Sequence, residues 1–254
     1  MTLNTGFLTL IRREIYRFVS VFKQTIFPPV ISSVLYFFVF GYSLGSRIPA
    51  IHGVPYMTFL IPGFMMMTVI ESSYANTSSS LFISRWANNI EEWLVTPLSY
   101  TEMVISILIG GLVRSAVISV SVYGISLLFV HTPITHPALM LFFVVFVSLI
   151  FSSLGIIVAL FAEEFEHLSV ATTFFITPLI YLGGVFHSID MVPPAIQPWT
   201  RLNPMFFMIN GIRHAMLGVS DVPVAHSLMV VLVLFTVLFS SAVTLFRIGF
   251  KLRK

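Results

Sequence analysis

The sequence predicts an all-α membrane protein with six transmembrane helices. Composition is the first reason, because hydrophobic residues make up 57% of the 254 residues and charged residues only 9%, against about 25% charged residues in soluble proteins. The second reason is that the apolar residues gather in six runs, each close to or above the about 20 residues that a helix needs to cross a bilayer. The runs cover residues 27–46, 56–74, 103–130, 138–162, 168–186 and 227–246.

The basic residues are the third reason, since they give the six runs one consistent orientation. Basic clusters precede the first run and follow the last, and Arg85 follows the second. An even number of spans puts these places on one side of the membrane, which the positive-inside rule makes cytoplasmic. We therefore expect both termini in the cytoplasm and no nucleic-acid partner. The clusters consist of Arg12, Arg13, Arg17 and Lys23, and of Arg247, Lys251, Arg253 and Lys254.

Residues 1–26 form the first predicted element, an amphipathic helix in the membrane interface. Apolar residues recur at spacings of three and four on one face, and basic or polar residues occupy the other. A helix of this kind lies among the lipid headgroups rather than crossing the bilayer. The alternative is a soluble helix packed on the cytoplasmic loops. The apolar face carries Leu8, Ile11, Ile15, Phe18 and Phe22, and the other face carries Arg13, Arg17, Ser20 and Gln24.

The first span carries Gly41 and Gly45, a spacing that allows two membrane helices to approach closely. We expect this face to pack in a dimer, together with the fifth span or the loop that caps it. With Ser43, the same residues match the letters of a hydrolase nucleophile elbow, Gly-x-Ser-x-Gly. That elbow requires a turn from a strand to a helix, so an intramembrane hydrolase is the less favoured alternative.

Two spans contain an internal proline, Pro62 in the second and Pro178 in the fifth. Each frees a backbone carbonyl that a neighbouring group or water must satisfy. The second span also becomes polar between Glu71 and Ser80. Helices that line a transport pathway are often polar in this way. The alternative is that residues 74–80 have already left the bilayer on the cytoplasmic side.

Glu71 and Arg114 are the two charged residues expected inside the bilayer. At about 1.5 Å per residue, Glu71 lies about 22 Å from the outer start of the second span and Arg114 about 16 Å from the inner start of the third. A lone charge near the centre of the membrane costs at least about 2.5 kcal/mol. We therefore predict a Glu71–Arg114 ion pair, or a network shared with Tyr74 and Asn76. The alternative is that each charge separately faces water or backbone carbonyls.

The cytoplasmic loop 82–102 contains a short amphipathic helix over residues 88–99. Its apolar side chains share one face, and two carboxylates lie beside them, so a helix held between two spans offers a docking surface. The docking residues are Asn89, Ile90, Glu91, Glu92, Trp93 and Leu94. In the outer loop 189–226, the apolar run 205–209 is too short to span and is expected to dip into the outer leaflet or to pack over the bundle.

These features together resemble the ABC-2 type membrane permeases, the membrane subunits of ATP-binding-cassette exporters. The resemblance covers nearly the whole chain and is carried by residues 88–98, by residues 178–186, by Asn203-Pro204 and by Gly211-Ile212-Arg213. It implies a homodimer in the bacterial plasma (inner) membrane with a separate ATPase chain bound beneath each half. It also implies that residues 1–26 form a connecting helix, residues 88–99 a coupling helix, and the outer loop re-entrant helices before the last span.

The resemblance implies a transport subunit rather than an enzyme, exporting an amphipathic or lipid-linked substrate. The chain has no P-loop motif, so we expect ATP and magnesium on the partner ATPase and no cofactor on this chain. No metal site is expected, because there is no cysteine and the seven histidines lack ligand spacing. The alternative is a transporter driven by an ion gradient with Glu71 as carrier. One domain covers residues 1–254, divided into the interfacial helix 1–26, the six-span bundle 27–246 and the basic tail 247–254.

Overall fold

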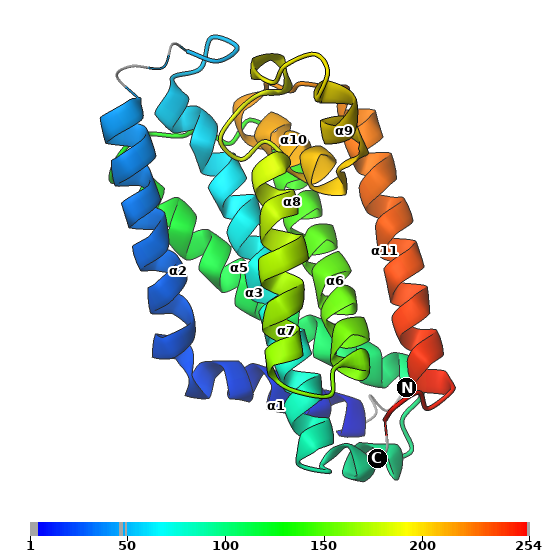
Figure 1. The fold of residues 1–254 in the computed structure, drawn as a ribbon. Coiled ribbons are helices and arrows are strands. Elements are labelled where there is room, and N and C mark those ends of the chain that lie inside the picture. The colour runs from blue at the N-terminus through cyan, green and yellow to red at the C-terminus, as the bar shows by residue number, and fades with distance from the viewer. Residues whose placement is uncertain (1–4, 46–47, 49, 253–254) are drawn as a thin grey trace.

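The computed structural model describes residues 5–45, 48 and 50–252 (Figure 1). The described residues are mostly helical and contain no β-strand, so the all-α prediction is confirmed; one isolated bridge joins Ile51 and Val54. Arg253 and Lys254 of the predicted basic tail and the predicted end of the first span at residue 46 lie outside the described residues, as does the side chain of Ser43.

The first half of the chain begins with α1, turns into a long irregular helix and then forms the longest helix of the fold. Its elements are α1 (Thr5–Ser20), α2 (Phe22–Tyr36) continuing as the π-helix η1 (Phe37–Leu44), α3 (Tyr56–Trp86), α4 (Ile90–Leu94) and α5 (Tyr100–Ser126). The second half contains α6 (Pro137–Phe161), then α7 (Glu166–Ala171), η2 (Thr172–Ile176) and α8 (Thr177–Leu182) in direct succession, then η3 (Ile189–Met191), α9 (Gln197–Leu202), α10 (Pro204–Leu217) and α11 (Val224–Arg247).

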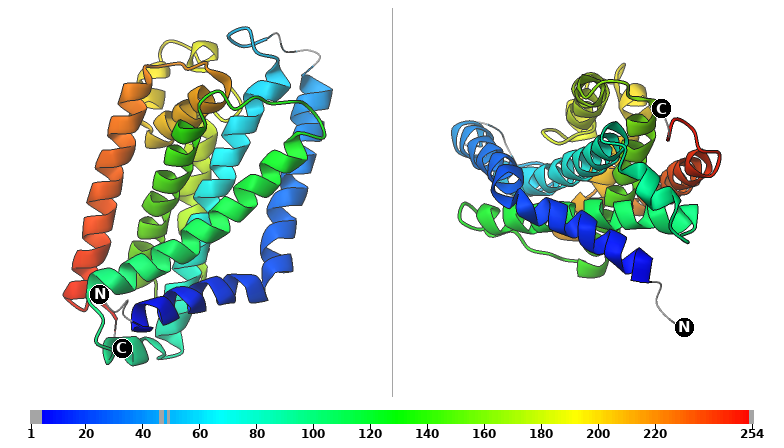
Figure 2. Two further views of the ribbon diagram at one scale, coloured as in Figure 1. Left: turned by 180° about the vertical axis from the view of Figure 1, so that it is seen from behind. Right: turned by 90° about the horizontal axis from the view of Figure 1, so that it is seen from below.

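The long helices form a bundle with α3 at its centre. Helix α3 packs against α5, α6 and α10, and most of its residues are buried. Helix α5 crosses the bundle obliquely, and α1 lies across one end of it (Figure 2). That end also carries both termini and α4, and we call it the terminal end. The opposite end carries η3, α9 and α10, and we call it the cap end (Figure 1).

Four helices among the described residues are long and apolar enough to cross a membrane. They are Phe22–Gly41, Tyr100–Ser126, Pro137–Phe161 and Val224–Arg247. The two other predicted spans are also helical. Helix α3 is long, but Glu71 and the hydroxyl-rich run after it lower its hydropathy. The segment from α7 to α8 is short and consists of three successive elements.

The ends of the helices follow local sequence signals. Ser99 and Glu102 form a capping box at the start of α5, each side chain bonding to the backbone of the other residue. Pro137 occupies the first turn of α6, where no intrahelical acceptor is lost. Helix α10 ends at Gly218, whose φ of 74° belongs to the left-handed region that favours glycine.

The internal prolines lie in two different settings. Helix α3 continues through Pro62 as one α-helix to Trp86, so the run 74–80 is not a helix end. Pro178 lies in the first turn of α8, directly after the π-helical turn η2. A π-helical turn is one of the adjustments that accommodate proline in a membrane helix.

Helix α1 is rotated relative to the amphipathic prediction. Its buried residues are Leu10, Glu14 and Phe18, so the buried face contains a carboxylate that the sequence pattern did not assign to it. Arg13 and Arg17, predicted to face away from the apolar side, flank Glu14 and reach α3. The physical reason is that α3 presents polar side chains at this depth, which satisfy the charges of α1.

Candidate functional site

Helix α1 is joined to α3 by a series of polar contacts at the terminal end. The accepting or donating positions on α3 are four residues apart, a spacing that places them on one helix face. Arg17 Nη2 donates to both the backbone and side-chain oxygens of Asn76, each at 2.8 Å, Ser80 Oγ donates to Glu14 Oε2 at 2.7 Å, and Arg13 Nη2 donates to Ser84 Oγ at 3.4 Å. We call these three pairs the α1–α3 polar contact.

The charges of α1 are balanced locally around the buried Glu14. Its carboxylate lies 3.6 Å from a nitrogen of Arg13 and 3.6 Å from a nitrogen of Arg17. Burial lowers the pKa of the Arg17 guanidinium, and the Glu14 carboxylate opposes this shift. Helix α5 can approach α1 closely because it has a glycine, Gly110, opposite Glu14. A Cβ added at Gly110 would lie 2.8 Å from the Cβ of Glu14.

Helix α4 is anchored on one face and open on the other. Ile90 and Trp93 are buried, whereas the carboxylates of Glu91 and Glu92 are on the exposed side. The guanidinium of Arg13 lies 4.7 Å from the centre of the Trp93 ring, within the range of a cation–π interaction. The helix predicted over residues 88–99 is thus shorter in the structure, with Asn89 just before it, and it contacts α1 directly.

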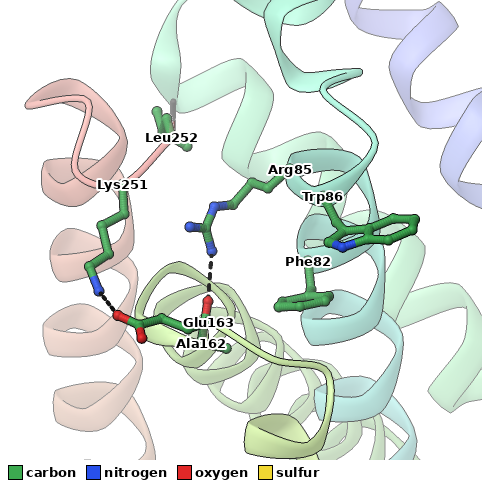
Figure 3. Close-up of a pocket in the computed structure, with 7 residues that line it drawn as sticks. All are labelled: Phe82, Arg85, Trp86, Ala162, Glu163, Lys251 and Leu252. Atoms are coloured by element: carbon green, nitrogen blue, oxygen red, sulfur yellow. Dashed lines mark hydrogen bonds and ion pairs between the residues drawn. The ribbon is translucent and has the colours of Figure 1, made fainter. Parts of the chain in front are cut away.

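A cavity of about 250 Å³ at the terminal end is lined by the end of α3, the loop after α6 and the C-terminal segment (Figure 3). Arg85 donates through Nη1 to the backbone oxygens of Ala159 and Ala162. Lys251 Nζ lies 3.0 Å from Glu163 Oε1, and this hydrogen bond lowers the pKa of the Glu163 carboxyl. The end of α3, the loop after α6 and the C-terminal segment are therefore held together at this cavity.

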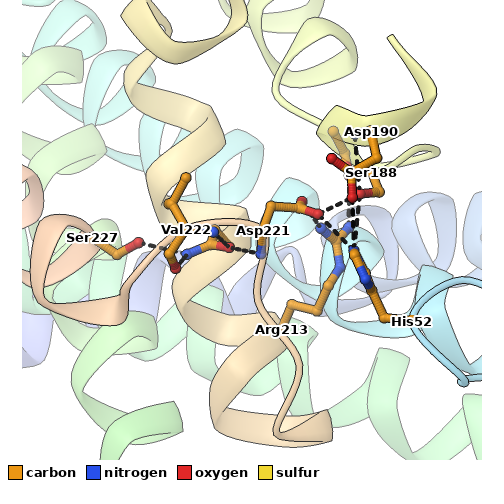
Figure 4. Close-up of polar contacts among 9 residues, drawn as sticks. His52, Ser188, Asp190, Arg213, Asp221, Val222 and Ser227 are labelled. Atoms are coloured by element: carbon orange, nitrogen blue, oxygen red, sulfur yellow. Dashed lines mark hydrogen bonds and ion pairs between the residues drawn. The ribbon is translucent and has the colours of Figure 1, made fainter. Parts of the chain in front are cut away.

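The cap end contains a second polar cluster, built around Arg213 of α10 (Figure 4). Arg213 Nη1 lies 3.4 Å from Asp221 Oδ2, and Arg213 Nη2 donates to the carbonyl of Gly184 at 2.6 Å. The guanidinium also lies 3.8 Å from the centre of the Phe59 ring. Gly184, whose carbonyl accepts this hydrogen bond, has a φ of 90°. Residues with a side chain rarely adopt this backbone conformation.

Two further side chains close this cluster. His52 Nε2 lies 3.0 Å from Asp221 Oδ1, and the hydroxyl of Ser188 donates to the same carboxylate (Figure 4). Asn210 Oδ1 accepts from the backbone nitrogen of Asp221 at 2.7 Å, and Asn210 Nδ2 donates to Ser227 Oγ at 3.0 Å. The loop before α11 is therefore tied to α10 and to the first loop of the chain.

The structure brings together three motifs that lie far apart in the sequence. Arg213 of the Gly-x-Arg motif binds Gly184 of the motif at 178–186. Asn203 of the Asn-Pro motif starts α10 by accepting from Met205 N at 3.0 Å, and it donates to the carbonyl of Leu179 at 2.6 Å. The second bond satisfies a carbonyl near the end of α8 that has no intrahelical partner.

The predicted ion pair between Glu71 and Arg114 is not formed in this structure. Asn76 and Tyr74 also bind elsewhere, to Arg17 and to the carbonyl of Leu168 respectively. The reason lies in the rotation of α3, since Glu71 is five residues from Asn76 and so is turned by about 140° from it. Asn76 faces α1 and α5, whereas Glu71 lines a cavity with residues of α2 and α8.

Gly41 packs inside the chain. A Cβ added there would lie 2.8 Å from Met57 Cγ at the start of α3. Gly41 is buried by its own chain and Gly45 is half-buried. The contacts of Gly41 therefore do not support the predicted dimer face.

Two important residues were missed by the sequence argument, Glu14 and Asp221. Glu14 has a signal, because it lies four residues from Phe18 of the predicted apolar face and four residues from the apolar Leu10.

Comparisons with known proteins agree on one group. The family described as "ABC-2 type transporter" matches residues 5–217. Inner membrane transport permease YadH of Escherichia coli (strain K12) is 41% identical over 227 residues, which are 89% of this chain and 88% of the relative. Nodulation protein J of Rhizobium meliloti (strain 1021) is 24% identical over 208 residues, covering 82% of this chain and 79% of the relative. Nodulation protein J of Rhizobium leguminosarum bv. viciae is 26% identical over 189 residues, covering 73% and 72%.

Proposed function

The chain belongs to the ABC-2 type transporter family and is the permease subunit of an ABC transporter in the inner membrane, and from this premise we propose that it works as an exporter. The substrate is an amphipathic or lipid-linked molecule. The energy comes from ATP hydrolysis in a separate ATPase chain, the partner that the family implies, which also holds the ATP and magnesium. This chain carries out transport and no catalysis, in keeping with relatives that are named transport permeases.

The observation that carries the proposal is the anchoring of α4. Ile90 and Trp93 fix the helix to the bundle, and Glu91 and Glu92 point away from it. A carboxylate pair on the free face of a fixed helix suits a basic cleft on a partner protein. Through Arg13 and Trp93, a movement of α4 reaches α1 and then α3. We assign α4 as the coupling helix and α1 as the connecting helix.

Six spans and two cytoplasmic termini complete the proposal. Helix α3 and the segment from α7 to α8 act as the second and fifth spans, although they are less apolar or shorter than the other four. The central position of α3 supports this assignment, because neighbouring helices cover its polar side chains and lipid does not meet them. The predicted re-entrant helices of the outer loop correspond to α9 and α10.

The topology can be tested on the chain as it exists, since the sequence contains no cysteine. Val95→Cys in the loop after α4 and Met191→Cys at the cap end change exposed side chains. A membrane-impermeant maleimide added outside intact spheroplasts should label the Met191→Cys variant and should label the Val95→Cys variant only after lysis. Labelling of both from outside would contradict the six-span arrangement.

We further propose that the working unit is a homodimer, as the family resemblance implies. A single bundle with α3 packed at its centre offers little enclosed space for an amphipathic substrate. The exposed apolar side chains Ile31 and Leu35 of the first span are available either to lipid or to a second copy. Native mass spectrometry of the purified permease should give a dimer mass, and a monomer alone would oppose this part of the proposal.

The docking assignment is tested by reversing the charge of α4. The double variant Glu91→Lys/Glu92→Lys, assembled with its ATPase partner in proteoliposomes, should lose about tenfold or more of ATP-driven transport, because like charges at a docking surface cost affinity and orientation. The double variant Glu91→Asp/Glu92→Asp keeps both charges and should retain transport. Normal transport by the lysine variant would contradict the assignment of α4 as the docking surface for the ATPase.

A further inference from the structure

A cavity of about 320 Å³ opens between α2, α3 and α8, separate from both polar ends of the bundle. Its lining combines hydroxyl groups, aromatic rings and one carboxylate. The members that matter are Ser32 and Tyr36 of α2, Phe64, Thr68 and Glu71 of α3, and Tyr181 of α8. The volume is at the lower end of the range of ligand pockets, about 300–1,000 Å³.

The carboxylate of Glu71 has no protein partner in this cavity. Among the described residues it forms no ion pair and no hydrogen bond, and no lysine or arginine lines the cavity. Arg114 lies instead within electrostatic range of Arg17 of α1. A carboxylate inside a bundle costs free energy unless an opposite charge or hydrogen bonds compensate it. The described residues supply neither, so a ligand that carries a positive charge would compensate the Glu71 carboxylate and be bound more tightly for it.

Two stacked aromatic rings, those of Tyr36 and Phe64, form one side of the cavity, which we call its aromatic wall. Tyr36 stacks on Phe64 with 5.1 Å between ring centres, and the hydroxyls of Tyr36 and Tyr181 lie 3.2 Å apart. The two hydroxyls hold α2 and α8 together across the cavity and keep the ring faces in place. Aromatic faces attract ammonium groups, most strongly where water is excluded. A carboxylate beside such a wall is suited to an organic cation.

We propose that this cavity binds the cationic group of an amphipathic organic cation, with Glu71 as its counter-ion and Tyr36 and Phe64 as its aromatic wall. The proposal deepens the export function above and rests on it for the role of the site. The cavity accommodates an ammonium head and a small ring, and the remaining apolar part of the ligand lies along the bundle outside it.

The test uses purified permease in lipid nanodiscs and equilibrium dialysis with radiolabelled benzyltrimethylammonium. The wild type should bind this cation saturably, and Glu71→Gln should weaken binding at least tenfold. Glu164→Gln is the matched control, because it removes an exposed carboxylate outside the cavity and should leave the affinity unchanged. Neutral benzyl alcohol should not compete. No saturable binding by the wild type, or equal binding by Glu71→Gln, would overturn the proposal.

A measurement on the wild type alone covers the case in which Glu71→Gln does not fold. Dicyclohexylcarbodiimide modifies carboxyl groups in apolar surroundings, and mass spectrometry can locate the product at Glu71. Benzyltrimethylammonium should slow this modification at least threefold, whereas benzyl alcohol should not. Equal rates would overturn the proposal. Neither assay needs ATP or the ATPase partner, so their failure is distinct from the failure of the Glu91→Lys/Glu92→Lys experiment, which concerns export itself.

Discussion

The two ends of the bundle both hold charged side chains, but they bury them to different extents. At the cap end, the side chains of Arg213 and Asp221 are each only 1% exposed. At the terminal end, Glu14 is fully buried, while its partners Arg13 and Arg17 are 38% and 28% exposed. The Arg213–Asp221 pair is thus closed to water, although His52 of the same cluster is 33% exposed. The α1–α3 polar contact is open to water on one side.

This difference indicates which end can rearrange. A buried ion pair loses its compensation when it separates, so it holds its geometry firmly. A partly exposed pair can exchange protein contacts for water at a small cost. Buried side-chain atoms that form no hydrogen bond among the described residues occur at both ends, including Arg17 Nε and Glu14 Oε1 at the terminal end and Arg213 Nε at the cap end, so the contrast rests on exposure. We interpret the cap end as the fixed part and the terminal end as the adjustable part, next to α4.

The largest expected effect is at the cap end. Arg213→Ala leaves the carboxylate of Asp221 buried without its cation and should lower the free energy of unfolding by about 3–5 kcal/mol. The measurement is thermal unfolding of the purified permease in detergent. Asp190→Asn is the control, since Asp190 is exposed near the same cluster and should change stability by less than about 0.5 kcal/mol. If Arg213→Ala costs as little free energy as the control, the Arg213–Asp221 ion pair does not hold the cap end in place.

A smaller effect is expected for the equivalent change at the terminal end. Arg17→Met keeps an unbranched apolar side chain but removes both hydrogen bonds to Asn76, and should cost about 1–3 kcal/mol. Arg17→Lys retains a positive charge next to Glu14 and should cost less. If Arg17→Met destabilises the permease more than Arg213→Ala does in the same unfolding assay, the contrast between the two ends is reversed.

The contact between α1 and α4 should contribute less again. Arg13→Gln removes the guanidinium above the Trp93 ring, which contributes about 0.5–1 kcal/mol at a partly exposed site. It also removes the 3.4 Å contact with Ser84 and the ion pair with Glu14. The same variant should reduce the coupling of ATP hydrolysis to transport in proteoliposomes, because α4 loses its direct contact with α1. Unchanged coupling together with the small loss of stability would show that α4 acts through another contact.

The smallest effect concerns pH at the cap end. Burial, and then the nearby Arg213, lower the pKa of His187, while Asp221 opposes the shift. The unfolded chain therefore takes up this proton at a higher pH than the folded chain does. Stability contributed by neutral His187 is present above the unfolded pKa and falls as the pH drops through that value toward the folded pKa. Unfolding scans between pH 7.5 and pH 5 should show a smaller pH dependence for His187→Gln, and an identical slope would contradict this prediction.

Helix periodicity and length were enough to predict the all-α fold, a short helix within residues 88–99 (Ile90–Leu94 in the structure) and the helical character of the six apolar runs. They were insufficient wherever the rotation of a helix decides the contact. Glu71 and Arg114 were matched by depth alone, but Glu71 faces α2 and α8 instead. Arg13 and Arg17 were assigned to lipid headgroups because the sequence did not show that polar residues of α3 lie at the same level. The partner of Arg213 depends on a loop conformation that periodicity does not describe.

The most direct test of the contrast is a distance measurement in the assembled transporter. Spin labels on Tyr16→Cys and Val95→Cys report on the terminal end, and labels on Trp199→Cys and Met229→Cys report on the cap end; all four side chains are exposed. Pulsed electron paramagnetic resonance should show that ATP shifts the distance distribution of the first pair and leaves that of the second unchanged. A shift confined to the Trp199–Met229 pair would contradict the account.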